Sequence, residues 1–128
     1  MRLDSDKEPT APLITIVDDE AAVREALVSL LRSAGYSTAD YSCAESFLAA
    51  PAASRTRCIV LDLHMPGMNG LDLQQRLADR QPKISIIFIS AQATEQQKGR
   101  ATHAGAIAFL NKPFRDQALL EAIAVALR

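Results

Sequence analysis

Short apolar runs rich in β-forming residues alternate five times with segments of helical period from Leu13 to the end of the chain, and this alternation constrains the fold most strongly. The runs at 58–63 and 85–90 are almost continuously apolar, which is typical of parallel strands covered on both faces. The pattern predicts an α/β fold, a doubly wound parallel sheet of five (βα) units joined by right-handed crossovers. The predicted strands are residues 13–17 (LITIV), 37–41 (STADY), 58–63 (CIVLDL), 85–90 (SIIFIS) and 107–110 (IAFL).

Helix signals fill the segments between these runs. Apolar residues recur at three- and four-residue spacing after the first strand, and Gly35 follows them as a helix stop. The last helix is expected over residues 116–127, and Gly99 weakens the fourth helix because glycine is a poor helix former. N-cap signals precede the second, third and fourth helices: Ser42 with Glu45, Asn69, and Thr94 with Gln97.

The chain has 128 residues, 48% of them hydrophobic, which is the size of one domain with a sizeable core. We predict one domain over residues 13–128 and a disordered arm at 1–12, where MRLDSDKEPTAP is polar and holds two prolines. The formal net charge of -1 offers no basic excess for nucleic acid or an anionic membrane. No apolar run approaches the roughly 20 residues that cross a bilayer, so a cytoplasmic location is expected. Cys43 and Cys58 are interpreted as ordinary thiols.

Polar residues stand at the carboxyl ends of four of the predicted strands. If the sheet has the flavodoxin-like order 2-1-3-4-5, the first and third strands are neighbours and their acids converge on one crevice. Ligands bind at this edge of doubly wound sheets, so the residues there are the candidate site. They are Asp18 and Asp19 after the first strand, Asp62 in the third, Ser90 after the fourth and Lys112 after the fifth.

Three converging carboxylates need a cation, because two like charges about 4 Å apart repel by roughly 4 kcal/mol at an effective dielectric near 20. Lys112 supplies one positive charge, and Mg²⁺, a hard ion that prefers oxygen ligands, suits the remainder. Asp62 can then act as a nucleophile that forms an aspartyl phosphate, with Ser90 donating a hydrogen bond to a phosphoryl oxygen. Taken singly, each of these residues is more often a cap, a turn or a surface group; their joint placement favours a site.

Four motifs carry a resemblance to a known family: IVDDE (16–20), IVLDLHMPGMNGLDL (59–73), FISA (88–91) and FLNKPF (109–114). Through them the chain resembles the receiver domain of two-component response regulators, from about residue 13 to 127. The segments VREALVSLLRSAGY and SFLAA place the resemblance nearest to the FixJ-like branch.

The resemblance implies a role for each site residue. Asp62 would be phosphorylated by a sensor histidine kinase, and Lys112 would pair with the phosphoryl group. Asp19, Asp62 and the backbone carbonyl of His64 would bind Mg²⁺, with Asp18 assisting through a water. The side chains of His64 and Gln92, each two residues beyond a site residue, would tune the lifetime of the phosphoryl group.

The resemblance also implies a switch. Ser90 would move toward the phosphoryl group while the aromatic ring of Phe109 turns inward, and the bond between Lys112 and Pro113 would be cis. Ser90 stands where threonine is commoner in the family, and Phe109 where tyrosine is commoner. The segment 91–108 lacks the Gly-Asp start and the apolar helix positions of the FixJ-like branch, so we expect a different partner surface there.

The leading hypothesis is a signalling switch, not an enzyme beyond catalysis of its own phosphorylation and dephosphorylation. Its fourth helix, fifth strand and last helix would face a downstream protein, a fused output domain or a second copy in a homodimer. An aspartate-nucleophile phosphatase of haloacid dehalogenase type is the alternative, but it needs an acid two residues after its nucleophile, where this chain has His64. A flavodoxin-like FMN binder is disfavoured by the acidic loop VDDEAAVRE. The sequence leaves open a stand-alone regulator or the receiver part of a DNA-binding regulator.

Overall fold

The computed structural model describes residues 12–128, so the predicted arm lies outside the described residues except for Pro12. Five strands form one parallel sheet in the order β2-β1-β3-β4-β5, which confirms the predicted topology. The strands are β1 (Leu13–Val17), β2 (Ser37–Tyr41), β3 (Thr56–Asp62), β4 (Ser85–Ser90) and β5 (Ala108–Asn111).

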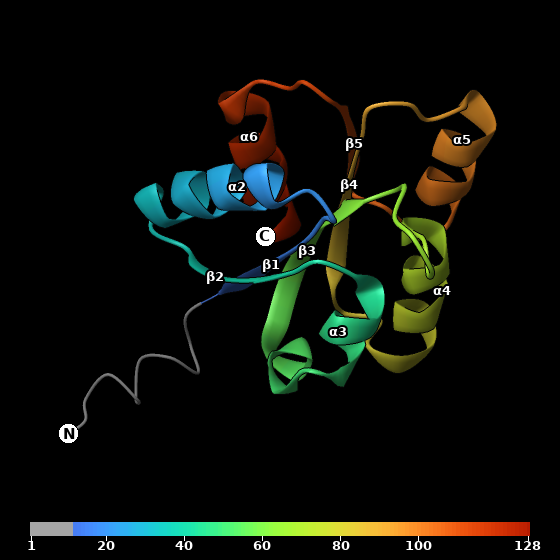
Figure 1. The fold of residues 1–128 in the computed structure, drawn as a ribbon, viewed down its shortest axis with the longest axis horizontal. Helices are drawn as coiled ribbons and strands as arrows, with labels where there is room; N and C mark the ends of the chain where they lie inside the picture. The colour runs from blue at the N-terminus through green and yellow to red at the C-terminus, as the bar shows by residue number, and fades with distance from the viewer. Residues whose placement is uncertain (1–11) are drawn as a thin grey trace.

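Helices cover both faces of this sheet, as Figure 1 shows, with α2 and α6 on one face and α3, α4 and α5 on the other. In the described part of the chain, no helix has the length and apolar character that a membrane crossing requires. The helices are α2 (Ala21–Ser33), α3 (Ala44–Ala49), the 3-10 helix η2 (Pro51–Arg55), α4 (Gly70–Arg80), α5 (Glu95–His103) and α6 (Asp116–Ala126).

The side chains of the central strands point alternately to the two faces and build two hydrophobic cores. Ile16 and Val60 pack into the core beneath α2 and α6. Leu61 and Phe88 pack into the core beneath α3 and α4. Each fully buried side chain of this size stabilises the fold by about 1.5–3 kcal/mol, so the sheet is a firm base for the residues at its carboxyl edge.

The predicted bounds of β1, β2 and β4 are confirmed, and those of the other strands are shifted. β3 begins two residues before the predicted run, at Thr56, because the Thr56 hydroxyl forms a buried hydrogen bond of 2.7 Å with the Thr15 hydroxyl. β3 ends at Asp62 instead of residue 63, and β5 spans Ala108–Asn111 instead of 107–110. A buried polar pair therefore extends a strand beyond the apolar run that predicted it.

Two of the three predicted N-caps are confirmed. The Asn69 side chain accepts a hydrogen bond from the Asp72 backbone, and Thr94 accepts one from Gln97 at 3.0 Å. The capping box of Ser42 with Glu45 is wrong, since α3 begins after Cys43, whose side chain makes no capping hydrogen bond within the described residues. Glu45 instead accepts a hydrogen bond from the backbone of Met68, at 3.1 Å, in the loop before α4.

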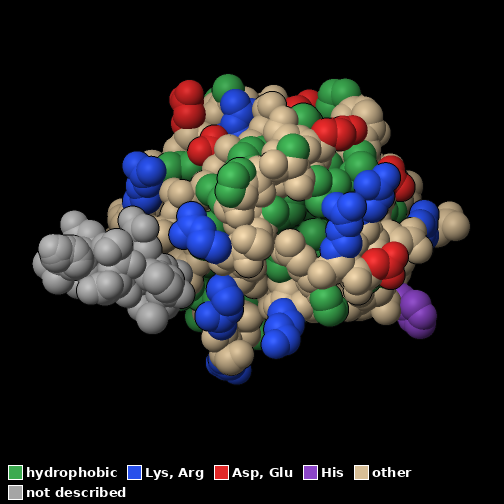
Figure 2. Space-filling view, turned by 90° about the horizontal axis from the view of Figure 1, so that it is seen from below, with side chains coloured by type: hydrophobic (Ala, Val, Ile, Leu, Met, Phe, Trp, Pro, Cys, Tyr) green, Lys and Arg blue, Asp and Glu red, His purple; other side chains and the backbone are tan. Residues whose placement is uncertain are grey.

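Charge is separated along the strand direction. The end of the molecule where the strands begin carries exposed cations, and Figure 2 shows Lys and Arg side chains gathered on the underside. The carboxyl ends of the strands carry the acids of the candidate site. A chain of net charge -1 thus has one basic and one acidic end. The cations next to the strand starts are Arg55, Arg57, Arg80, Lys83 and Arg128.

Candidate functional site

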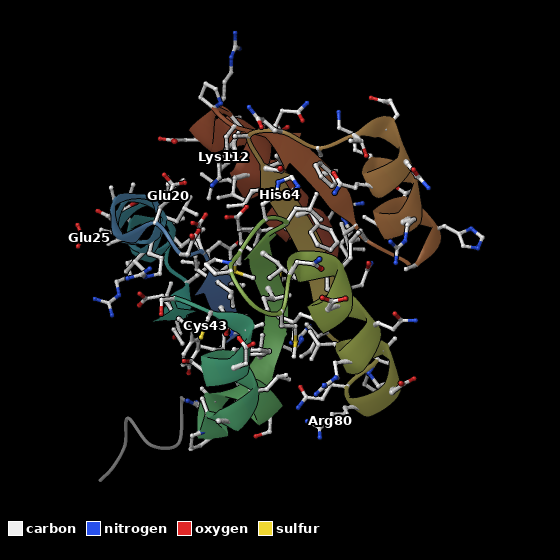
Figure 3. The ribbon with its side chains drawn as sticks, turned by 45° about the vertical axis from the view of Figure 1, so that its right-hand side comes forward. Glu20, Glu25, Cys43, His64, Arg80 and Lys112 are labelled. Carbon is white, nitrogen blue, oxygen red and sulfur yellow. The ribbon has the colours of Figure 1, made fainter. Side chains whose placement is uncertain are left out.

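Asp19, Asp62 and Lys112 line one open cavity of about 520 Å³ at the carboxyl edge of the sheet, and the fully buried Asp18 and Ser90 lie next to residues of its lining. The Lys112 ammonium lies 3.0 Å from a carboxylate oxygen of Asp18 and 3.8 Å from one of Asp62. Figure 3 shows Lys112, Glu20 and His64 at this end of the molecule and Arg80 at the other. The predicted convergence of the acids and the lysine is confirmed as geometry.

Asp18, Asp19 and Asp62 form an acidic cluster in which one carboxylate oxygen of each lies within 4.8 Å of the others. Lys112 also forms an ion pair with Glu20 at 3.2 Å, so one ammonium is paired with three carboxylates, those of Asp18, Glu20 and Asp62. At such distances each like-charge pair costs about 3–4 kcal/mol at an effective dielectric near 20. Clustered carboxylate oxygens with excess negative charge are a donor set that fits a hard divalent cation such as Mg²⁺.

The ionisation of Asp62 and Lys112 follows from their surroundings. Burial, and then repulsion from Asp18, raise the pKa of the Asp62 carboxyl to about 6, although the Lys112 charge and the His64 backbone N–H oppose the rise. Burial alone would lower the pKa of Lys112, but its hydrogen bond to Asp18 and the charge of Asp62 outweigh burial, and the pKa is raised. Lys112 is therefore a permanent cation, whereas the Asp62 charge is costly until a further cation arrives.

Backbone hydrogen bonds hold the site residues at their places. The Leu63 N–H donates to the Ile89 carbonyl at 3.0 Å, and the Lys112 N–H donates to the Ser90 carbonyl at 2.8 Å. These bonds continue the sheet ladder beyond the regular strands, up to the cavity. The Asp62 carboxylate accepts from the His64 N–H at 3.3 Å, and the bond between Lys112 and Pro113 is cis, as predicted.

Ser90 is fully buried and belongs to a short hydrogen-bonded chain of polar groups. Its hydroxyl oxygen accepts from the Gln92 backbone N–H at 3.2 Å and lies 3.4 Å from Nδ1 of His64. The other ring nitrogen of His64 lies 3.4 Å from Nε2 of Gln97, in the first turn of α5. Gln92 thus reaches Ser90 through its backbone, and its side chain lines the cavity.

Phe109, the predicted switch aromatic, is half-buried beside this cluster. Its ring stacks on Phe88 with 5.7 Å between centroids, and the Lys98 ammonium lies 5.9 Å from the ring centre. The predicted movements of Ser90 and Phe109 stay predictions, as does metal binding by the His64 carbonyl.

Residues 14–124 match the family model described as Response regulator receiver domain. The chain is a response regulator receiver domain. This match confirms the family predicted from the motifs and leaves the phosphatase alternative without support.

Relatives of the receiver domain agree with the family assignment. It is 45% identical over 118 residues to the Response regulator protein TodT of Pseudomonas putida, a match that covers 92% of this chain and 52% of TodT. It is 37% identical over 110 residues to the Transcriptional regulatory protein FixJ of Rhizobium meliloti (strain 1021), covering 86% of this chain and 54% of FixJ. A solved structure of the response regulator StyR superposes with a TM-score of 0.84 at 45% identity, covering 91% of this chain and 59% of StyR. The chain therefore spans about half the length of the curated relatives that it matches.

Two contacts of the receiver domain were missed by sequence reasoning. Glu20 pairs with Lys112, and Gln97 contacts His64. The sequence did contain a signal for Gln97, the capping box with Thr94, but that signal concerns the start of a helix and gives no reason to place the side chain at the cavity.

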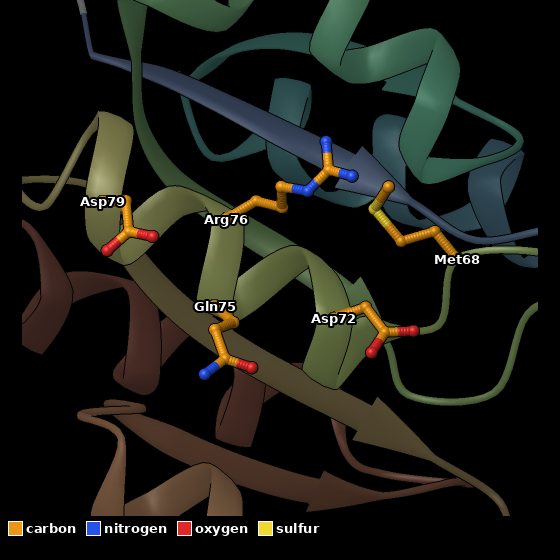
Figure 4. Close-up of a pocket in the computed structure, with 5 residues that line it drawn as sticks. All are labelled: Met68, Asp72, Gln75, Arg76 and Asp79. Atoms are coloured by element: carbon orange, nitrogen blue, oxygen red, sulfur yellow. The ribbon is translucent and has the colours of Figure 1, made fainter.

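A second hollow of the receiver domain, of about 420 Å³, lies on the outer side of α4 (Figure 4). Asp72, Arg76 and Asp79 line it together with Met68 and Gln75. It does not include the acidic cluster or Lys112, so the candidate site is the cavity at the strand ends.

Proposed function

We propose that Asp62 accepts a phosphoryl group from the phosphohistidine of a sensor histidine kinase in the cytoplasm. A carboxylate oxygen of Asp62 bonds to phosphorus while the bond from phosphorus to the histidine nitrogen breaks, and the kinase imidazole leaves. One observation carries the proposal: the Asp62 carboxylate ends a buried strand, opens onto the cavity and has the Lys112 ammonium 3.8 Å away.

The acidic cluster supports a role for Mg²⁺ in this step. Asp19, Asp62 and the His64 carbonyl would hold the ion, with Asp18 acting through a water. When bound, the ion supplies positive charge next to the phosphoryl oxygens. The receiver domain thereby catalyses its own phosphorylation and dephosphorylation and turns over no separate substrate.

Lys112 and Ser90 act on the phosphoryl group directly. The Lys112 ammonium neutralises one phosphoryl oxygen, and the Ser90 hydroxyl donates a hydrogen bond to another. Movement of Ser90 toward phosphorus and the inward turn of Phe109 then favour one of two existing conformations. His64 and Gln92, which line the same cavity, adjust how long the phosphoryl group lasts.

The conformational change would be transmitted to a partner through α5, β5 and α6. Candidates are a downstream protein, a fused output domain or a second copy in a homodimer. Val125 of α6 is 46% exposed and Ile107, just before β5, is 41% exposed, so both side chains are available for contact with a partner. The net charge of -1 gives the domain no overall attraction to nucleic acid.

Labelling followed by intact mass tests the central claim. The protein is mixed with Mg²⁺ and acetyl phosphate, and we expect one phosphoryl group on the wild type and none on Asp62→Asn. Asp79→Asn, which removes an exposed acid of α4, is the matched control and should label like the wild type. Equal labelling of the wild type and Asp62→Asn, or no labelling of the wild type, contradicts the proposal.

The homodimer has a test of its own. Light scattering with and without beryllofluoride, a phosphoryl mimic, should show a rise in mass on activation, and Val125→Glu should suppress it. An unchanged mass argues against dimerisation and leaves the other partners in place.

A further inference from the structure

We propose that Gln97 is a positioning residue for His64, whose imidazole it holds in the tautomer with the proton on Nδ1, and that it thereby prolongs the aspartyl phosphate. This inference rests on the proposed phosphorylation of Asp62. It concerns the chain of contacts from α5 to the site, which runs from Thr94 through Gln97 and His64 to Ser90.

The capping box of α5 fixes which way the Gln97 amide points. The Thr94 backbone N–H donates to Oε1 of Gln97 at 2.9 Å, and the Gln97 backbone N–H donates to the Thr94 hydroxyl oxygen at 3.0 Å. A carboxamide has one oxygen and one NH₂ group, and the cap engages the oxygen. The NH₂ group of Gln97 therefore faces the imidazole.

The orientation of the amide determines the tautomer of His64. Nε2 of Gln97 can only donate, so Nε2 of His64, 3.4 Å away, must accept. In a neutral imidazole the proton then lies on Nδ1, which donates to the Ser90 hydroxyl oxygen at 3.4 Å. Both contacts are at the long end of the hydrogen-bond range, so a single substitution can reverse them.

This arrangement prepares Ser90 for the phosphoryl group. Its hydroxyl oxygen accepts from Nδ1 of His64 and from the Gln92 N–H, which occupies both lone pairs. The Ser90 O–H proton remains to donate to a phosphoryl oxygen. Gln97 thus influences a group that it does not touch.

The same arrangement prevents His64 from acting as a general base in hydrolysis of the aspartyl phosphate. In that reaction a water oxygen bonds to phosphorus, the bond from phosphorus to the Asp62 carboxylate oxygen breaks, inorganic phosphate leaves, and a base receives the proton of the water. His64 lines the cavity, but both of its ring nitrogens are engaged while Gln97 donates to Nε2. A free lone pair on the imidazole would make it a general base for the attacking water.

The variant Gln97→Glu tests the assignment with a minimal change in shape. The carboxylate still accepts from the Thr94 N–H, so the capping box is kept, but the atom that faces His64 becomes an acceptor. We expect the proton to move to Nε2, which leaves a lone pair on Nδ1 beside the Ser90 hydroxyl. In the phosphorylated protein the Ser90 O–H donates to the phosphoryl group, so this lone pair is left for the attacking water. Gln96→Glu adds the same charge on the exposed neighbouring residue and is the matched control.

Two measurements read the outcome. Nitrogen-15 imidazole spectra in mildly alkaline buffer should show the Nδ1–H tautomer in the wild type and in Gln96→Glu, and the Nε2–H tautomer in Gln97→Glu. The decay of labelled protein should be about threefold faster or more in Gln97→Glu only, since general bases accelerate such steps substantially. In a His64→Gln background, Gln97→Glu should no longer change the decay.

The inference is overturned by an Nε2–H tautomer in the wild type. Equal decay of Gln97→Glu and Gln96→Glu, or an effect that persists without His64, overturns it as well. Absence of labelling at Asp62 would refute the proposed function and the effect on lifetime, while the spectra of the unphosphorylated protein would still decide the tautomer.

Discussion

At Asp62, the requirements of folding and of the proposed phosphorylation oppose one another. The carboxylate is buried beside Asp18, which raises its pKa to about 6 from an ordinary value of 3.8. Between these two values the folded state binds more protons than the unfolded state, so the free energy of unfolding falls as pH rises. The contribution of Asp62 to stability is complete below the unfolded pKa and is lost as pH rises through about 6.

We expect Asp62→Asn to stabilise the metal-free protein at neutral pH, by on the order of 1–3 kcal/mol, because the amide has no charge to bury. Near pH 4 (about the unfolded pKa) most of this gain should disappear. Urea unfolding in the presence of a chelator at both pH values measures it, with Asp79→Asn as the control. A variant that is less stable than the wild type at neutral pH would show that burial and repulsion do not dominate at Asp62.

At the scale of elements, the two helices beside the cavity are attached differently. α4 buries Gly70, Leu71, Leu73, Gln74 and Leu77, whereas α5 buries Ala101 among its described residues. At the start of α4, a Cβ on Gly70 would lie 2.7 Å from the Asp62 carbonyl oxygen and 3.0 Å from the Phe88 ring. Gly99 in α5 has no described atom within 4 Å of such a Cβ, apart from its own helix backbone and chain neighbours.

Two alanine substitutions should therefore have opposite signs. Gly70→Ala should destabilise by about 1–3 kcal/mol, as overpacking does, and should reduce labelling because the backbone of Asp62 must shift. Gly99→Ala should stabilise by roughly 0.5–1 kcal/mol through helix propensity alone. Urea unfolding of both variants measures the two changes in the free energy of unfolding. A Gly70→Ala variant that is more stable than the wild type would mean that α4 can shift to accommodate the added methyl group.

Local patterns could predict most elements, because apolar periodicity and N-cap residues are local signals. They failed where a contact joins distant residues: Thr56 extends β3 because it bonds Thr15, and Glu45 is diverted from its cap by Met68. The role of Gln97 as a capping residue was predicted, but its contact with His64 at the site was missed. Its backbone contact is local, and its contact with His64 depends on how α5 packs.

At the scale of the whole molecule, the parallel sheet explains why the site could be predicted at all. Each strand brings its last residue to one edge, so Asp18, Asp62 and Lys112 meet although they are 44 and 50 positions apart in the chain (62 − 18 and 112 − 62). The basic end was not predicted, because its cations are spread along the sequence and form no local cluster that would indicate a basic surface.

Binding of Mg²⁺ should raise the stability of the whole domain, because the acidic cluster exists only in the folded chain. At ten times the dissociation constant the gain is about 1.4 kcal/mol. Magnesium should therefore raise the melting temperature of the wild type. Asp19→Asn should show a smaller rise, whereas Glu25→Gln, which removes an exposed acid of α2, should show the full rise. Identical melting curves with magnesium for the wild type and Asp19→Asn would contradict a site built on Asp19.

The unequal burial of α4 and α5 also has a mechanical meaning. A displacement that began at Asp62, as the proposed phosphorylation would cause, would meet a tightly packed helix on the side of Gly70 and a loosely packed one on the side of Gln97. For the same force, the loosely packed helix is displaced further. If Asp62 is phosphorylated, we therefore expect the outer surface of α5 to change more than that of α4.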